Sequence, residues 1–352
     1  GARARRRLRG GADGGAGAVG RGPNDLVGLQ EQVYSQNYEG IHDIIKQLRA
    51  TLDEYGDKVM IGEIWLPLED RMLYYGIGQN DEFHMPFNFD LIDDGSFQNP
   101  TRWTAQTFRN LVDTHDAAVP EHGWPNYVLG NHDVSRLASR IGGVDRARVA
   151  GMLLLTLRGT PTIYMGEEIG MVNGDIPPEK VQDPQGLVLG PEYTRDTCRT
   201  PMQWDSSEYA GFSDVEPWLP VNADYQSVNV AVEDEDSSSI LNLYRELLWL
   251  RKGSSALQIG SYESLDTENN TYAFLRPADD ETMLIVLNFN AESVTLTLPY
   301  SGQIVLSTTV SRTEPFESEL KLAGNEGVVE ALDYLIASNR KGLGDKVASF
   351  DD

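Results

Sequence analysis

The sequence is poor in the residues that would cross-link the chain or anchor it in a membrane. Cys198 is the only cysteine among 352 residues, which excludes a disulfide within the chain and a metal site built from several thiolates. No apolar run approaches the roughly 20 residues that a membrane-spanning helix needs. The sequence therefore predicts no membrane partner, and no motif in it requires a cofactor.

Positive charge is also scarce. The 29 Lys and Arg residues face 54 Asp and Glu residues, so the formal net charge is −25. Such a surface repels nucleic acid, which we therefore exclude as an expected partner. It is equally compatible with adaptation to high salt and with an ordinary acidic enzyme. What the chain does contain is a globular composition, with 40% hydrophobic residues, and enough length for one large domain and a smaller one.

The two ends of the chain differ from the rest. Residues 1–24 hold six arginines and many Gly and Ala residues but almost no large apolar side chain, so they cannot pack into a core. We interpret them as an unstructured segment, and favour a shifted reading frame over a basic nucleic-acid-binding arm. Residues 332–352 form a polar tail. No signal peptide is visible, and we expect a cytoplasmic protein.

Short apolar runs alternate with helical stretches over residues 25–253. Strands are expected at 59–62, 87–91, 127–130 and 162–165, and helices at 41–52, 102–116, 146–157 and 240–252. Strands buried on both faces and separated by helices indicate a parallel sheet. Half of a (β/α)₈ barrel fits this pattern, and so does a doubly wound sheet.

The pattern changes in the last third of the chain. Residues 175–226 are rich in Pro, Gly, Asp and Trp and predict a long irregular loop. From residue 254 to 331 the chain predicts a small antiparallel β domain. Its strands are expected near 271–276, 282–289, 293–298, 303–309 and 317–322.

Two carboxylates follow predicted strands, Glu63 and Asp133. Side chains at the carboxyl ends of barrel strands point into a common pocket. Glycoside hydrolysis needs such a pair, because one carboxyl group protonates the leaving oxygen and another attacks or stabilises the cationic transition state. An acidic residue after a strand is, however, most often a solvated loop residue.

His132 and Asp133 could alternatively form a metal-binding dyad, as in helical HD-type phosphohydrolases. Further His ligands would be needed, and the other four histidines have no ligand-like spacing. The dyad also follows a strand instead of lying in a helix. We therefore expect no metal, and a lone hydrogen-bonded histidine is the main rival to a sugar-binding one.

Several ordered motifs resemble those of the α-amylase superfamily, glycoside hydrolase family 13. They are GEIW at 62–65, FNFD at 87–90, NHDVSR at 131–136 and TPTIYMGEEIGM at 160–171. The motifs IPPE at 176–179, QDP at 182–184 and RDTCRTPMQW at 195–204 resemble the α-glucosidase and oligo-1,6-glucosidase branch. The resemblance covers about residues 33 to 330.

The resemblance implies barrel strands five to eight followed by a C-terminal β-sandwich. It implies that Glu63 is the general acid/base and that Asp133 stabilises the transition state. His132 and Arg136 would bind the sugar at the cleavage site, and Arg195 is a candidate for the neighbouring subsite. The expected partner is an oligosaccharide with terminal α-glucosidic bonds.

One motif of the family is missing. Its nucleophile is an Asp in a G-F-R-x-D motif, and this sequence contains none; Asp13 follows no strand and is no substitute. We therefore interpret the chain as N-terminally truncated and expect it to be inactive alone. Two alternatives remain. The site could transfer or isomerise glucosyl groups, as in trehalose synthase, or the chain could be a non-catalytic scaffold relative.

Overall fold

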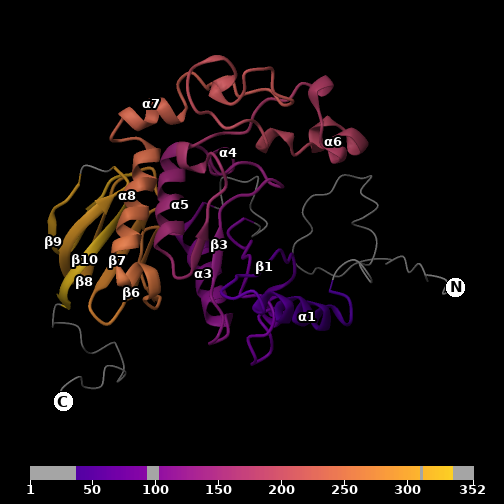
Figure 1. Cartoon of the computed structure of the whole chain (residues 1–352). Helices are drawn as coiled ribbons and strands as arrows, with labels where there is room; N and C mark the ends of the chain where they lie inside the picture. The colour runs from indigo at the N-terminus through magenta and orange to yellow at the C-terminus, as the bar shows by residue number, and fades with distance from the viewer. Residues whose placement is uncertain (1–36, 93–102, 310–311, 336–352) are drawn as a thin grey trace, which may run out of the picture.

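The computed structural model describes residues 37–92, 103–309 and 312–335 (Figure 1). Parallel strands surrounded by helices form its first part, and an antiparallel sheet forms its second part. The predicted fold class, half of a (β/α)₈ barrel followed by a small antiparallel β domain, is confirmed. The predicted segment 1–24, with Asp13, and residues 336–352 of the predicted tail lie outside the described residues.

Four short strands pair in parallel, in the order in which they occur in the chain. They are β1 (Ile61–Gly62), β2 (Met85–Pro86), β3 (Asn126–Val128) and β4 (Thr160–Thr162). β1 pairs with β2, β3 pairs with β4, and a parallel bridge between Asn88 and Tyr127 joins the two pairs. A doubly wound sheet reverses its strand order, whereas a barrel keeps its strands in sequence. The observed order therefore favours the barrel over the doubly wound sheet.

Three of these strands begin one or two residues before the predicted positions and are shorter than predicted. β2, β3 and β4 replace the expected strands at 87–91, 127–130 and 162–165. The residues just beyond the strands, such as Phe89 and Leu129, are still only 4% and 0% exposed. These apolar residues are buried although they lie beyond the hydrogen-bonded ladder. The apolar run in the sequence is therefore longer than the strand, and the predicted strand positions are displaced toward the C-terminus.

The four predicted helices are confirmed within three residues at each end. They are α1 (Ile41–Asp53), α3 (Ala105–Ala118), α5 (Val144–Thr156) and α8 (Ile240–Gly253). Side-chain caps define two of the starts, because Thr104 accepts a hydrogen bond from the Thr107 amide and Ser239 accepts one from the Asn242 amide. Three shorter helices accompany them: α2 (Leu68–Leu73), α4 (Leu137–Ile141) and α9 (Ser255–Ile259).

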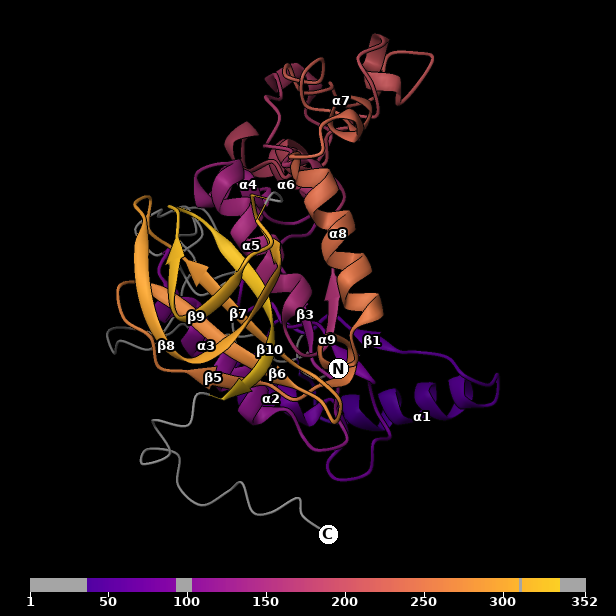
Figure 2. The ribbon, with the colours of Figure 1, turned by 90° about the vertical axis from the view of Figure 1, so that its left-hand side faces the viewer.

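Helices α5 and α8 lie between the parallel strands and the antiparallel sheet (Figures 1 and 2). Helix α5 is buried along most of its length, and its leucines pack with Tyr244 and Leu247 of α8 and with Phe274 and Ile285 of the sheet. One apolar core therefore joins the two parts of the chain. The buried guanidinium of Arg276 adds a polar link, because it donates to the main-chain carbonyls of Ser261, Gly260 and Thr156.

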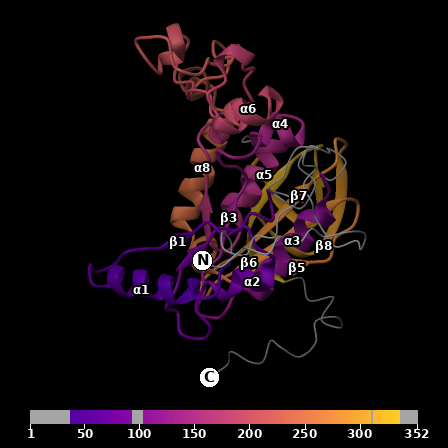
Figure 3. The ribbon, with the colours of Figure 1, turned by 90° about the vertical axis from the view of Figure 1, so that its right-hand side faces the viewer.

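The segment 175–226 is largely irregular, as predicted, and projects as an arm beyond the ends of α4 and α8 (Figures 1 and 3). It contains α6 (Pro184–Leu189), and α7 (Val230–Glu235) follows it. Short 3₁₀ turns lie within it or just before it, at Glu167–Ile169, Pro178–Lys180, Pro191–Tyr193, Asp196–Cys198 and Glu208–Gly211. Within the described residues, no helix combines the length and apolar character that crossing a bilayer requires.

The C-terminal part is one six-stranded antiparallel sheet in the order β5-β6-β7-β10-β8-β9. Its strands are β5 (Glu263–Leu265), β6 (Thr271–Pro277), β7 (Thr282–Asn288), β8 (Val294–Ser307), β9 (Pro315–Leu322) and β10 (Gly327–Leu335). The predicted strands at 293–298 and 303–309 form a single strand, because the residues around Pro299 make a register shift instead of a turn. Strand β10 was not predicted, and it extends four residues beyond the expected boundary at 331.

The sheet curls so that one of its faces encloses a second core. Alternate residues of β6 and β7 point to opposite sides: Phe274 and Ile285 join the core with the helices, whereas Ala273 and Val286 join a separate cluster. That cluster also includes residues of β8, β9 and β10. This arrangement gives the β domain an apolar interior of its own.

A carboxyl group lies in this second core without a partner. Glu330 of β10 is 0% exposed, and neither of its carboxyl oxygens has a hydrogen-bond partner. It pairs in register with Leu284 of β7 and Ile304 of β8, both members of the second cluster. Burial raises the pKa of Glu330 to about 8, so the folded chain keeps this carboxyl group protonated at neutral pH.

This burial predicts a loss of stability at alkaline pH. Because the folded pKa of Glu330 lies above its ordinary value, the unfolded chain releases the proton first, and the free energy of unfolding falls as the pH rises from about 4.5 through about 8. Glu330→Gln should remove this dependence and be more stable than the wild type at pH 9 by about 2–4 kcal/mol. Denaturant unfolding at pH 5 and pH 9 measures the difference. The exposed Glu319→Gln on β9 is the control, and equal pH dependence in all three proteins would contradict the prediction.

Candidate active site

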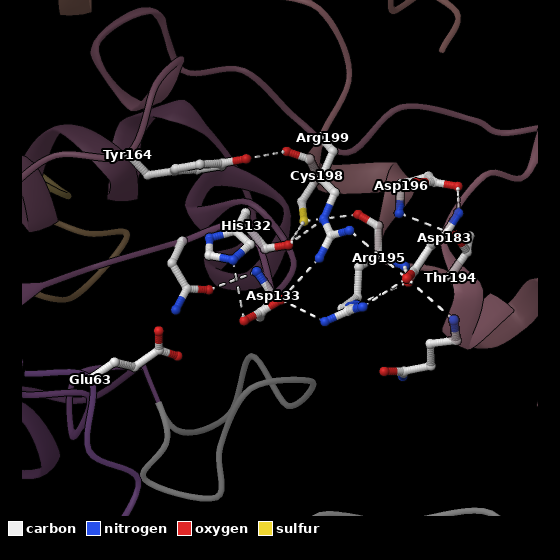
Figure 4. Close-up of polar contacts among 12 residues, drawn as sticks. Glu63, His132, Asp133, Tyr164, Asp183, Thr194, Arg195, Asp196, Cys198 and Arg199 are labelled. Carbon is white, nitrogen blue, oxygen red and sulfur yellow. Dashed lines mark hydrogen bonds and ion pairs between the residues drawn. The ribbon is translucent and has the colours of Figure 1, made fainter. Parts of the chain in front are cut away.

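Glu63 and Asp133 lie at the same edge of the parallel sheet. Glu63 directly follows β1, and Asp133 follows β3 after a turn of four residues. Because β1, β2 and β3 run parallel and lie side by side in chain order, their carboxyl ends lie at one edge of the sheet. Figure 4 shows the carboxyl group of Glu63 directed toward the space beside Asp133, with no contact drawn between the two side chains. The structure therefore brings together the two carboxylates that the sequence singled out.

The carboxyl group of Glu63 is held on one side. Its Oε1 atom accepts a hydrogen bond of 2.9 Å from the indole nitrogen of Trp65. The Trp65 ring in turn stacks on Phe89, with ring centroids 3.9 Å apart and planes 2° from parallel. Glu63 is otherwise exposed at the surface of the described chain.

Two arginines neutralise Asp133. Its Oδ1 atom accepts hydrogen bonds of 2.7 Å from Arg195 and 2.9 Å from Arg199, while its main-chain amide donates to Asn131. The other oxygen, Oδ2, lies 3.5 Å from Nε2 of His132. His132 is 60% exposed, so its ring can reach a ligand. Both arginine contacts of Asp133 therefore lie on Oδ1, and Oδ2 faces His132.

Arg195 was predicted as a substrate-binding residue, and the structure places it between two carboxylates. Besides Asp133, it donates from Nε and Nη2 to Asp183, at 2.9 and 2.7 Å. The Asp183 side chain is 0% exposed. Its hydrogen bonds with Arg195 hold the pKa of Asp183 well below its ordinary value and so keep it ionised.

Arg136 was predicted as a residue that binds the sugar at the cleavage site. It is only 2% exposed, and its guanidinium donates to the main-chain carbonyls of Met165 and Thr200. Arg136 therefore joins the end of β4 to the loop. The sugar contact that the resemblance implies for Arg136 stays a prediction.

Arg199, which the sequence did not single out, is a further cation at the site. Arg199 pairs with Asp133 and also donates to the main-chain carbonyl of His132, at 2.7 Å. Its signal was present in the sequence, because it follows Arg195 by four residues in the RDTCRTPMQW motif. Only the short 3₁₀ turn Asp196–Cys198 between them lets both guanidinium groups reach one carboxylate.

Glu167 is a second residue that the sequence did not single out. It is 5% exposed, and burial raises its pKa to about 8. A Cβ atom added at Gly130 would lie 2.5 Å from Oε1 of Glu167, so the turn that carries Asp133 begins against this carboxyl group. A glycine at position 130 permits that close approach.

A cavity of about 760 Å³ adjoins Arg199, although Glu63, His132 and Asp133 do not line it. Asp183 and Arg199 line it together with the aromatic rings of Phe212 and Trp218, which are 50% and 74% exposed. A cavity of this size with aromatic walls and a few charged groups is typical of small-molecule sites. Among the described residues, no group of three or more His, Cys, Asp and Glu side chains could hold a metal ion.

Comparisons with known proteins agree with this geometry. The catalytic domain of α-amylase matches residues 17–260, and the C-terminal domain of maltogenic amylase matches residues 262–322. A probable α-glucosidase of Rhizobium meliloti is 34% identical over 87% of this chain and 52% of its own length. The human amino acid transporter heavy chain SLC3A1 is 35% identical over 76% of this chain and 39% of its own length.

Solved structures give the same picture. The trehalulose synthase MutB of Pseudomonas mesoacidophila is 31% identical, with a TM-score of 0.73 over 84% of this chain and 59% of the other. The chain spans about half the length of the curated relatives it matches.

The buried pair of Asp183 and Arg195 predicts how firmly the arm is held. Asp183→Asn should destabilise the segment 175–226 by about 3 kcal/mol, because it leaves Arg195 without its main partner. Since the pKa of Asp183 is lowered, the contribution of the pair is complete at neutral pH and is lost only as the pH falls below the ordinary Asp value of 3.8. Limited proteolysis of the arm measures the effect. Glu216→Gln, which breaks an exposed ion pair with Lys180 on the same arm, is the control and should leave the cleavage rate close to that of the wild type. Equal cleavage rates for the two variants would contradict the prediction.

Proposed function

The chain belongs to the α-amylase family, glycoside hydrolase family 13. On that premise we propose that it supplies the general acid/base and the transition-state-stabilising carboxylate of a retaining α-glucosidase. The expected substrates are malto- or isomalto-oligosaccharides with terminal α-glucosidic bonds. The observation that carries the proposal is the position of Glu63 and Asp133 at one edge of the parallel strands. Arg199, which binds Asp133, also lines the aromatic-walled cavity. The α-glucosidases among the relatives support the proposal.

Each residue has a distinct task in this proposal. Glu63 protonates the glycosidic oxygen as the bond to the anomeric carbon breaks, and later accepts a proton from the attacking water. Asp133 binds sugar hydroxyls through its accessible oxygen and stabilises the positive charge that develops on the ring. His132 donates to a hydroxyl of the same sugar. Arg195 and Arg199 hold Asp133 in place, so their contribution is to orient the carboxylate.

The attacking carboxylate would come from a preceding half of the barrel. In retaining glycosidases the nucleophile and the acid lie about 5–5.5 Å apart, and the nucleophile forms a covalent glycosyl intermediate. No G-F-R-x-D motif occurs in this chain. We use "complete enzyme" below for a protein in which this chain follows the first half of a family barrel.

A glucosyl transferase or isomerase is the second candidate. It is favoured by the likeness to trehalulose synthase MutB and to an isomaltulose synthase of Klebsiella, which is 28% identical with a TM-score of 0.74. The scaffold alternative draws support from the transporter heavy chains among the relatives. Against it, the chain retains Glu63, His132 and Asp133 together.

The complete enzyme should release α-glucose first from p-nitrophenyl α-glucoside, whose only sugar comes from the cleaved bond, as observed by ¹H NMR before mutarotation. Glu63→Gln should lower kcat on maltose and isomaltose at least about 10²-fold, because the acid is lost. Glu69→Gln, an exposed acid of α2, is the matched control and should keep the wild-type rate. Release of β-glucose, or a Glu63→Gln variant as fast as Glu69→Gln, would refute the proposed mechanism. Disaccharide isomers in place of free glucose would select the second candidate.

The 352-residue chain on its own should show negligible turnover, because it lacks the G-F-R-x-D motif that would supply the nucleophile of the covalent intermediate. Glucose release from maltose, followed by a coupled assay, provides the measurement. The Glu63→Gln variant of the same chain serves as the blank. Glucose release at a rate ordinary for an α-glucosidase, abolished in this blank, would show that the chain is catalytically sufficient.

A further inference from the structure

Among the described residues, Trp65 donates a side-chain hydrogen bond to the proposed acid, Glu63. The indole Nε1 atom of Trp65 lies 2.9 Å from Oε1 of Glu63, two residues away. Trp65 is 38% exposed, so it stands at the border between the protein and the pocket. Neither the family resemblance nor the sequence assigned it a role.

The orientation of Trp65 is set by the neighbouring strand. Its ring stacks in parallel on Phe89, which is only 4% exposed and packs with Phe87 and Val128. Phe89 follows Asn88, whose main-chain amide donates to the carbonyl of Asn126 in β3. The indole is therefore tied to β2 and β3, and Asp133 emerges from β3. Through these contacts, the position of the Glu63 carboxyl group is fixed relative to β3 and therefore relative to Asp133.

An indole nitrogen can only donate a hydrogen bond. The oxygen that it contacts must accept, whether the carboxyl group is protonated or ionised. The carbonyl oxygen of a protonated carboxyl group accepts a hydrogen bond better than its O–H oxygen does, so when Glu63 carries its proton this contact favours Oε1 as the carbonyl oxygen and the proton on Oε2. Resting on the function proposed above, we propose that Trp65 is a positioning residue that assigns the acid proton of Glu63 to Oε2, the oxygen that meets the glycosidic bond.

The proton balance follows from this assignment. In the first step the Oε2–H bond breaks, its proton moves to the glycosidic oxygen, and the electron pair of the bond to the anomeric carbon leaves with that oxygen. A carboxylate nucleophile of the first barrel half forms the new bond to the anomeric carbon. In the second step water attacks that carbon, releases the nucleophile and returns a proton to Oε2. Trp65 donates to Oε1 throughout.

A different role for Trp65 would be a flat surface on which a sugar stacks. Trp65→Phe separates the two roles, because phenylalanine keeps an aromatic ring over Phe89 but has no N–H group. Trp65→Ala removes both the ring and the donor. Trp249→Phe, an exposed indole of α8 that is 66% exposed, is the matched control for the loss of a tryptophan.

The first test concerns the contact and needs no activity. The chain contains six tryptophans, so the indole N–H region of a ¹H–¹⁵N spectrum holds few signals, and Trp65→Phe identifies the one from Trp65. Glu63→Ala should shift that signal, and Glu69→Ala should leave it in place. An unshifted Trp65 signal in Glu63→Ala would overturn the proposal, whatever the chain is found to hydrolyse.

The second test concerns catalysis in the complete enzyme and compares two leaving groups. Maltose needs protonation of its leaving oxygen, whereas α-glucosyl fluoride departs with little help from an acid. Trp65→Phe should lower kcat/KM for maltose about 10-fold and leave the value for the fluoride within about 2-fold of wild type. Equal losses on both substrates, or a loss no larger than that of Trp249→Phe, would overturn the proposal.

The two tests also separate this proposal from the proposed function. If Glu63→Gln hydrolyses maltose normally, Glu63 is not the acid, and the function fails together with the role of Trp65. If Glu63→Gln is impaired on maltose but Trp65→Phe is not, the function stands and the positioning role alone is wrong.

Discussion

The site depends on one constraint, the parallel pairing of four very short strands in chain order. Each strand contributes only two or three residues to the ladder, yet their pairing brings Glu63 and the Asn131–Asp133 turn to a common edge. Two main-chain hydrogen bonds carry this pairing across the middle of the sheet: the Phe87 amide donates to Gly62 and the Asn88 amide donates to Asn126, each at 2.9 Å. Without them the two carboxylates would belong to separate structural units.

Further order comes from hydrogen bonds and ion pairs that connect the irregular arm to the barrel. Arg195 and Arg199 donate hydrogen bonds to Asp133, and Arg136 donates a hydrogen bond to the main-chain carbonyl of Thr200. The hydroxyl of Tyr164, which follows β4, donates to the carbonyl of Cys198. A segment with little regular secondary structure can therefore form a fixed wall of the site, because its charged side chains have their partners in the barrel.

The alternation of helices and strands was predictable because periodicity reports burial, and burial decided helices α3, α5 and α8. Helix α1 follows its apolar spacing although Ile45 is its only buried residue in the described chain. The same dependence on burial misplaced β2 and β3, whose apolar runs continue into the buried residues Phe89 and Leu129. Strand β10 escaped prediction because its short apolar stretch ends in Glu330, a charged residue by sequence that is neutral in the core. The roles of Arg136 and Arg199 depend on which way each guanidinium turns, and only the three-dimensional packing of the arm determines that.

The central claim is that Glu63 and Asp133 act on one sugar ring. The most direct measurement is a crystal structure of the complete enzyme with a cationic iminosugar that mimics the charged transition state. The account predicts that a carboxylate oxygen of Asp133 lies within hydrogen-bond distance of the ring hydroxyls while Glu63 faces the position of the departing oxygen on the same ring. A bound sugar that contacts only one of these residues, with the other directed away from it, would contradict the account.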